Sequence, residues 1–229
     1  QEEIKRFYSG FPKDAHPMIL LNLAVMSLEV TLLDSPAPIA ISSQLLNRQD
    51  GEDEYHVRSA ALGEGMDPRK SRGFERRVLV PQLQRHEDHD VVLGYKCAQS
   101  GMTLACAYQH LLDFDGEAEI HTEVTPDHAK TVFSVTVEPD RPLTLTKLIS
   151  YHTSRGVPAP ELADRCDRTI ERAVSLGVEA VFDAQRAWLD DFWRRADIEI
   201  DGDPAAQQAV RWNLFQLAQA SARTQEQGI

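Results

Sequence analysis

The sequence predicts a mainly β protein, an antiparallel β-sandwich followed by linker α-helices. Short segments with period-two hydrophobic alternation fill residues 1–158, and helical spacing of apolar residues replaces this pattern in residues 159–229. The strand-like segments also follow one another without a helical stretch between them, which is typical of an antiparallel sandwich or barrel. We therefore divide the chain into a β-sandwich domain, residues 1–158, and a helical part, residues 159–229.

The predicted strands share an alternation of apolar and polar residues that places one face of each strand in a core. In chain order they are residues 19–33, 39–43, 77–84, 91–95, 102–108, 118–124, 131–137 and 143–150. Gly, Pro and Asp residues separate them, as in Gln99-Ser-Gly101 and Glu138-Pro-Asp-Arg-Pro142, and these residues favour turns.

The helical part begins after Val157-Pro-Ala-Pro160. Its apolar residues recur three and four positions apart: Leu162, Cys166, Ile170 and Val174, then Val178, Val181, Phe182, Trp188, Leu189, Phe192 and Trp193, and finally Val210, Leu214, Phe215 and Leu217. Ile198-Glu-Ile200 is expected to form a short strand-like break, and Asp203 to cap a last helix with Pro204 at its first position. The wide aromatic faces need a large packing partner, which the β part or a continuation of the chain could supply.

The composition excludes several classes of protein. The 229 residues carry 24 Lys and Arg against 36 Asp and Glu, a net charge of −12, which argues against nucleic acid or an anionic membrane surface as the main partner. No apolar run approaches the roughly 18 to 20 residues that a membrane span needs. Three widely spaced cysteines, Cys97, Cys106 and Cys166, fit a reducing cytoplasm better than a disulfide framework.

Two acidic segments are candidates for metal binding. His86-Glu-Asp-His-Asp90 contains metal-ligand side chains, but it lies between two predicted strands, and we favour a hairpin loop. Asp113-Phe-Asp-Gly-Glu117 lacks the twelve-residue spacing and the final Glu of a calcium loop, so we expect a turn.

One basic segment is a candidate anion site. Pro68-Arg-Lys-Ser-Arg-Gly-Phe-Glu-Arg-Arg77 concentrates five cations, which could bind phosphate or carboxylate. We favour a surface loop whose cations pair with neighbouring acids, namely Asp50, Glu52, Asp53, Glu54 and Glu64. Gly63-Glu-Gly65 lacks the Gly-Lys-Ser/Thr ending of a phosphate-binding loop.

The remaining candidates each have a structural interpretation. The cysteines lie within apolar patterns and are expected to be small buried side chains, and there is no Gly-x-Ser-x-Gly elbow. Tyr151-His-Thr153 could bind a ligand, but a structural hydrogen bond is the favoured role. Trp188, Trp193 and Trp212 could stack on sugars, yet their helical spacing favours the core. The residues alone therefore assign no catalytic, cofactor-binding or metal-binding side chain.

Three adjoining stretches resemble the linker region of glycoside hydrolase family 65. They are Ala187-Trp-Leu-Asp-Asp-Phe-Trp193, then Ala196-Asp-Ile-Glu-Ile200 with Asp201-Gly-Asp-Pro204, and Gln207-Gln-Ala-Val-Arg-Trp-Asn-Leu-Phe-Gln-Leu217. Leu45-Leu-Asn-Arg-Gln-Asp-Gly51 and Ser100-Gly-Met-Thr-Leu104 are similar to stretches of the β-domain of that family. Its members are phosphorylases and hydrolases of α-glucosides such as trehalose, maltose and kojibiose.

The resemblance implies a supersandwich of the galactose-mutarotase-like type, helical linkers, and then an (α/α)₆ barrel that carries catalysis. A barrel glutamate would protonate the glycosidic oxygen while phosphate or water attacks the anomeric carbon with inversion. We expect residues 159–229 to be the helical linker and the first barrel helix, the chain to stop about where that helix would end, and its start to be truncated, so no catalytic residue is carried over. No cofactor is implied, and inorganic phosphate would be a co-substrate.

Three hypotheses for the function follow. The chain is the non-catalytic N-terminal portion of such an enzyme, inactive alone and acting in the complete protein on an α-glucoside disaccharide. Alternatively it is a freestanding carbohydrate-binding module, or an interaction domain whose aromatic helices pair with a protein. A homodimer, the identity of the disaccharide and the choice between phosphate and water are left open by the sequence.

Overall fold

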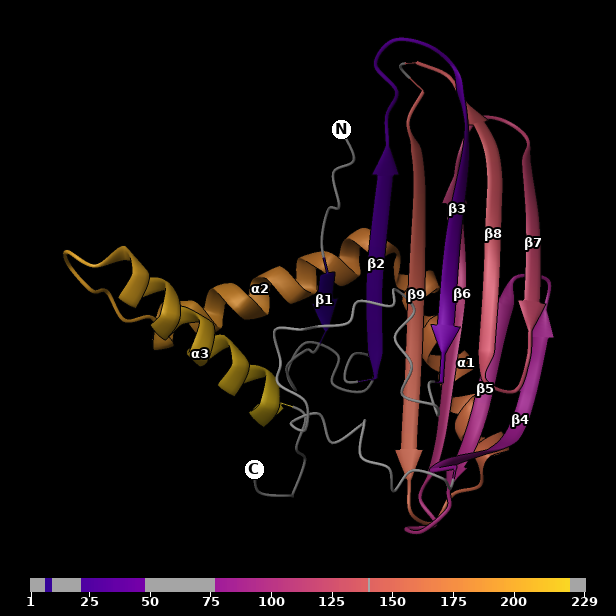
Figure 1. Cartoon of the computed structure of the whole chain (residues 1–229). Coiled ribbons are helices and arrows are strands. Elements are labelled where there is room, and N and C mark those ends of the chain that lie inside the picture. The colour runs from indigo at the N-terminus through magenta and orange to yellow at the C-terminus, as the bar shows by residue number, and fades with distance from the viewer. Residues whose placement is uncertain (1–6, 10–21, 48–76, 140, 223–229) are drawn as a thin grey trace, which may run out of the picture.

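The chain folds into two stacked antiparallel β-sheets with helices after them (Figure 1), and the computed structural model describes residues 7–9, 22–47, 77–139 and 141–222. The strands are β1 (Phe7–Ser9), β2 (Leu23–Val30), β3 (Ala37–Leu46), β4 (Leu79–Glu87), β5 (Asp90–Cys97), β6 (Thr103–Asp113), β7 (Ala118–Val124), β8 (His128–Val137) and β9 (Leu143–Ser154). The helices are α1 (Ala159–Leu176), α2 (Val178–Ala196) and α3 (Pro204–Ala222).

The two sheets differ in size. The larger has the strand order β1-β2-β9-β6-β5-β4, and the smaller has the order β3-β8-β7. Every pair of neighbouring strands is antiparallel. Because β3 is an edge strand, it tolerates Pro38, which has no backbone N–H to donate.

Alternating side chains of the two sheets meet in the core between them. On β8, Phe133, Val135 and Val137 point inward and are buried, whereas Ser134 and Thr136 between them are exposed. This alternation follows from the period-two geometry of a strand and fixes which face of the small sheet is open to solvent.

Helix α1 covers the opposite face of the larger sheet. Leu162, Cys166 and Ile170 on α1 pack against Ala105 and Ala107 of β6 in one apolar cluster. The helix approaches β5 so closely that a Cβ added to Gly94 would lie 3.2 Å from the Cβ of Ala159. The apolar stripe therefore anchors the helical part directly on the sheet.

Helices α2 and α3 form an arm that extends away from the sandwich (Figure 1). The predicted cap of α3 is confirmed, because Asp203 Oδ1 accepts the backbone N–H groups of Ala205 and Ala206 at 3.0 and 3.1 Å. The predicted break between the helices is confirmed, because α2 ends at Ala196 and α3 begins at Pro204. Its predicted strand-like character is wrong: Ile198–Ile200 form no strand, and the Ile200 N–H bonds to the side chain of Gln207 instead.

The fold class is confirmed as an antiparallel β-sandwich followed by helices. Strand β1 was not predicted, and residues 19–21 of the first predicted strand lie outside the described residues. Among the described residues, no helix combines the length and apolar character needed to cross a membrane.

Candidate functional site

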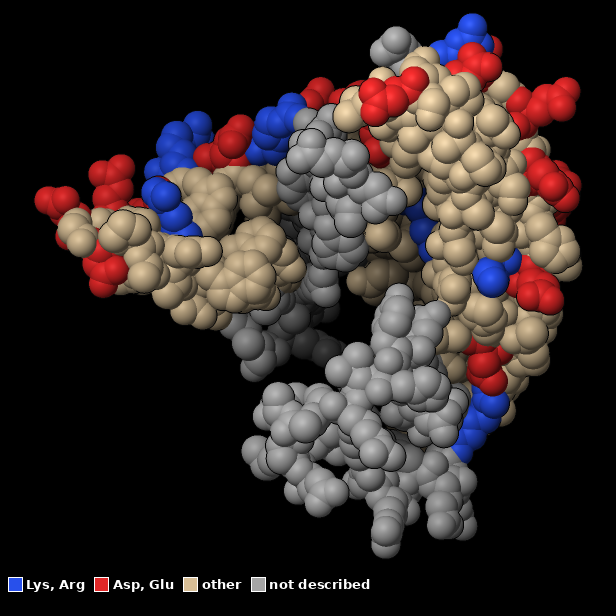
Figure 2. All heavy atoms as spheres, turned by 45° about the horizontal axis from the view of Figure 1, so that its top comes forward, with Lys and Arg blue, Asp and Glu red and all other residues tan. Residues whose placement is uncertain are grey.

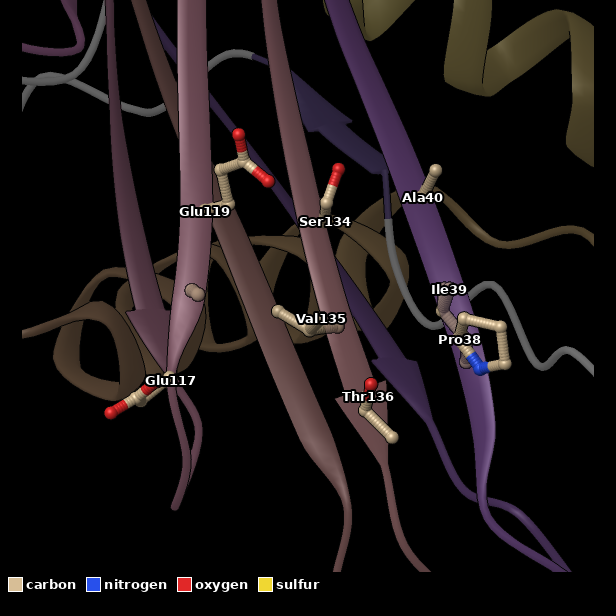
Figure 3. A pocket seen from close by; sticks show the side chains of 9 residues that line it. Pro38, Ile39, Ala40, Glu117, Glu119, Ser134, Val135 and Thr136 are labelled. Carbon is tan, nitrogen blue, oxygen red and sulfur yellow. The ribbon is translucent and has the colours of Figure 1, made fainter.

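A groove lies on the solvent-exposed face of the smaller sheet (Figure 3). The strand register explains its shape: Glu119 on β7 pairs with Ser134 on β8, and Ser134 pairs with Ala40 on β3. The next row places Thr136 opposite Pro38. Small side chains on β8 and β3 thus form a low floor beside the longer Glu119, and the groove encloses about 740 Å³.

We define the outer groove by Pro38, Ala40, Glu119, Ser134 and Thr136. The polar side chains among them, Glu119, Ser134 and Thr136, have no hydrogen bond or ion pair within the described residues. Figure 3 shows the carboxylate of Glu119 and the hydroxyl of Ser134 projecting from the same face of the sheet. Glu117 also lines the groove, which therefore offers two carboxylates and two hydroxyl groups to a ligand.

A second exposed feature is the aromatic surface of the arm, which we define as Trp188, Phe192 and Trp193 on α2 with Trp212 and Phe215 on α3. The rings contact one another within each helix: the Trp188 and Phe192 ring centroids are 5.8 Å apart on α2, and those of Trp212 and Phe215 are 6.1 Å apart on α3. Trp193, Trp212 and Phe215 line a groove of about 750 Å³, and Trp212 is 61% exposed. In Figure 2 the arm presents an uncharged area bordered by charged side chains.

Specific bonds hold α3 to the end of α2. Arg211 donates from Nε and Nη2 to the two carboxylate oxygens of Asp197, over 2.8 and 2.5 Å, and this pairing lowers the pKa of Asp197. Gln207 accepts from the Ile200 N–H and donates to the Ile198 carbonyl, both at 2.7 Å. These bonds join α3 to the segment Asp197–Ile200 that follows α2.

A polar network crosses the core between the sheets. The Tyr108 hydroxyl bonds to Thr131 Oγ1 at 3.0 Å, and His110 Nε2 bonds to Ser43 Oγ at 2.7 Å. Lys147 lies over the Tyr108 ring, with Nζ 4.6 Å from its centroid, and donates to the Gln44 carbonyl at 2.8 Å. These contacts join both sheets and involve residues that our sequence interpretation did not single out.

Burial dominates the electrostatics of this network. It lowers the pKa of His110 to about 3, with a further contribution from the nearby Lys147 charge. It also lowers the pKa of Lys147 to about 8. In the sequence, Lys147 interrupts an alternating apolar series formed by Leu143, Leu145 and Ile149. This interruption is the pattern from which the polar network could have been predicted.

The predicted metal candidates form turns, as expected. His86 and Glu87 end β4, Asp88 and His89 make the turn with Asp88 at φ 50°, and Asp90 begins β5. Residues 114–117 form a short bend that connects β6 of the larger sheet to β7 of the smaller sheet. Within the described ranges, no three His, Cys, Asp or Glu side chains are grouped so that they could hold a metal ion.

Of the basic segment, residues 68–77, the structure describes only the last residue, Arg77. Arg77 forms an ion pair with Asp127 and donates from Nε to the Leu79 carbonyl at 2.8 Å. Residues 68–76, the acids at 50–64 and Gly63–Gly65 lie outside the described residues, so the anion site and the pairing with those acids stay predictions.

The structural role predicted for Tyr151-His-Thr153 is confirmed at His152, which bonds to Asn22 and to Thr169 of α1. Cys166 is buried as predicted, whereas Cys97 and Cys106 are only partly buried. The prediction that Trp212 belongs to the core is wrong, because its packing partners within the described residues are confined to the arm.

Comparisons with known proteins match this chain to one family. Residues 17–192 match the model of the glycosyl hydrolase family 65 N-terminal domain. An uncharacterized glycosyl hydrolase of Mycobacterium tuberculosis is 31% identical over 208 residues, which cover 91% of this chain and 25% of that protein. The α,α-trehalose phosphorylase of Thermoanaerobacter brockii is 34% identical over 128 residues, covering 56% of this chain and 16% of the relative.

A solved structure shares the fold. The "Putative kojibiose phosphorylase from human microbiome" superposes with a TM-score of 0.64 at 16% identity, over 87% of this chain and 23% of that chain. The chain thus spans about a quarter of the length of the first relatives that it matches. The extent of the family match establishes that this chain belongs to glycosyl hydrolase family 65, with the N-terminal domain of that family at residues 17–192.

Proposed function

We propose that this chain is the non-catalytic N-terminal portion of an enzyme that cleaves α-glucosidic disaccharides. The observation that carries the proposal is the family match over residues 17–192, together with relatives named as trehalose and maltose phosphorylases. Catalysis would reside in a C-terminal (α/α)₆ barrel, where a glutamate acts as general acid and phosphate or water inverts the anomeric carbon. Inorganic phosphate would then be a co-substrate, and no cofactor is proposed.

The aromatic surface of the arm supports the proposal that a separate catalytic domain packs against this chain. Five aromatic rings on two helices, with Trp212 61% exposed, are more apolar surface than a helix pair needs when it faces only water. The Asp197–Arg211 ion pair links α3 to the residue after α2, and Trp193 of α2 lines one groove with Trp212 and Phe215 of α3. We propose that the partner is the catalytic barrel that follows in the complete protein.

The proposal also includes the cellular setting. Three free thiols, at Cys97, Cys106 and Cys166, favour a reducing compartment, and we propose the cytoplasm. A homodimer of the complete enzyme, and the absence of nucleic acid and membrane partners, remain predictions.

Paired variants of the arm test the packing role. Trp212→Glu and Phe215→Glu place a charge in the aromatic surface, so we expect both to lower the melting temperature and the activity of the complete protein. Trp212→Glu should leave the melting temperature of the 229-residue chain within about one degree, because Trp212 is exposed there and substitutions at exposed positions change stability little. Gln216→Glu, on the same helix but outside the lining of the groove, is the matched control.

The result separates the proposal from its alternatives. Equal behaviour of Trp212→Glu and Gln216→Glu in the complete protein would contradict the packing role. Capture of a different protein by the aromatic surface of the complete enzyme would instead support the interaction-domain hypothesis.

A further inference from the structure

We infer that the outer groove of the β3-β8-β7 sheet binds a neutral pyranose ring, so that the sandwich carries a sugar site of its own. The site rests on the groove geometry, and only the choice of an α-glucoside as its ligand rests on the proposed function. It lies on the face of the smaller sheet that points away from the larger sheet, and its lining residues belong to β3, β7, β8 and the turn before β7.

The dimensions of the groove suit one or two sugar rings. Its volume of about 740 Å³ falls within the roughly 300 to 1,000 Å³ typical of small-molecule sites. The floor of the groove is low because Ala40 and Ser134 are small and lie side by side in the strand register. The Pro38 ring and the Ala40 methyl group offer apolar contact to the C–H face of a pyranose.

The polar groups match sugar hydroxyls. An ionised carboxylate accepts hydrogen bonds, and hydroxyl groups both donate and accept, which is the pattern that a ring bearing several hydroxyls requires. Glu119 and Ser134 are cross-strand partners, and Thr136 follows on the same face of β8, so one ring could reach all three side chains. None of these side chains would have to break an existing bond within the described residues.

The charge of the groove selects among sugars. Glu117 and Glu119 both line it, and its lining contains no Lys or Arg. A phosphorylated sugar would therefore bring negative charge next to carboxylates, which is unfavourable. The groove should accept a neutral disaccharide and reject the corresponding sugar phosphate.

A titration of the 229-residue chain tests this inference. We expect maltose or trehalose to shift amide NMR resonances of residues 38–40, 117–119 and 134–136, with millimolar affinity because the groove is open. Glucose 1-phosphate should produce no such shifts at the same concentrations. Glu119→Ala should weaken binding of the neutral sugar about tenfold, the usual effect of losing a hydrogen bond to a charged group.

Two further variants make the result decisive. Ser134→Leu fills the floor of the groove and should abolish binding, while its exposed position keeps the fold intact. Glu123→Ala removes a carboxylate from the same face of β7 outside the groove and should bind like the unmodified chain. Absence of shifts with every neutral sugar tested, or equal binding by Ser134→Leu, would overturn the inference and leave the proposed function untouched.

Discussion

The side chain of His152, near the end of β9, bonds through Nε2 to Oγ1 of Thr169 on α1 at 3.1 Å. The Thr169 hydroxyl donates to the Arg165 carbonyl at 2.8 Å, so it accepts from His152, which must carry its proton on Nε2. Nδ1 then accepts from the Asn22 amide at 3.2 Å. A neutral imidazole with one defined tautomer therefore links the sheet, the turn before β2 and the first helix.

Protonation of His152 should weaken this link. Burial and the charges of Arg165 and Arg168 lower the pKa of His152 below its usual value of 6.5. The folded state thus favours the neutral form, and its contribution to stability is complete above pH 6.5 and is lost as the pH falls toward the lowered pKa.

The first prediction concerns this pH dependence. Between pH 7.5 and pH 5, we expect the melting temperature of the unmodified chain to fall more than that of His152→Gln, which cannot be protonated. Differential scanning fluorimetry measures both slopes. Parallel slopes would show that His152 does not couple protonation to folding.

The second prediction concerns the close approach of α1 to β5. In Gly94→Ala the new methyl group would lie 3.0 Å from Leu83 Cβ and 3.2 Å from Ala159 Cβ, so these neighbours must move by a few tenths of an ångström. We expect a loss of about 1 to 3 kcal/mol in unfolding free energy, as for other overpacked cores, measured by urea denaturation. Gly156→Ala, where nothing lies within 4 Å, is the control and should change stability little. An equal effect of the two substitutions would contradict the packing of α1.

The third prediction concerns Lys147. Its pKa is lowered from 10.5 to about 8, so the ammonium form costs stability at pH 7, and the cost disappears as the pH rises from 8 to 10.5. We expect Lys147→Met to raise the melting temperature by a few degrees at pH 7 and by less at pH 9.5. A lower melting temperature at pH 7 would mean that the Tyr108 ring and the Gln44 carbonyl stabilise the charge by more than burial costs.

The fourth prediction uses the exposure of Trp212. Because this indole is 61% exposed, acrylamide should quench a large part of the tryptophan fluorescence of the 229-residue chain. Trp212→Phe should remove the most accessible component and leave the less exposed Trp188 and Trp193. In the complete protein the quenching of Trp212 should fall, and unchanged quenching would contradict burial of the arm.

The strands could be predicted largely from the sequence because their signal is local. The alternation in residues 131–137 depends only on which side chains face the core, and β8 follows it. The order of the strands could not be predicted, since the pairing of β9 with both β2 and β6 joins residues more than 100 positions apart for β2 and more than 30 for β6. Such pairings depend on the packing of the whole sheet.

The candidate sites could not be predicted from the sequence, because they too depend on contacts between residues that are far apart along the chain. The outer groove arises because Ala40, Ser134 and Glu119 from three strands form one row, and no segment of sequence contains that row. Trp212 has the spacing of a core residue, but spacing does not reveal whether a helix face is covered by described residues.

The proposed function is tested by the activity of the complete protein on α-glucosides. The protein encoded by the complete reading frame and the 229-residue chain would be incubated with trehalose, maltose and kojibiose, with and without inorganic phosphate, and glucose and glucose phosphate measured. We expect the complete protein to cleave at least one of these disaccharides and the 229-residue chain to cleave none. Cleavage by the 229-residue chain alone, or no cleavage of any α-glucoside by the complete protein, would contradict the proposed function.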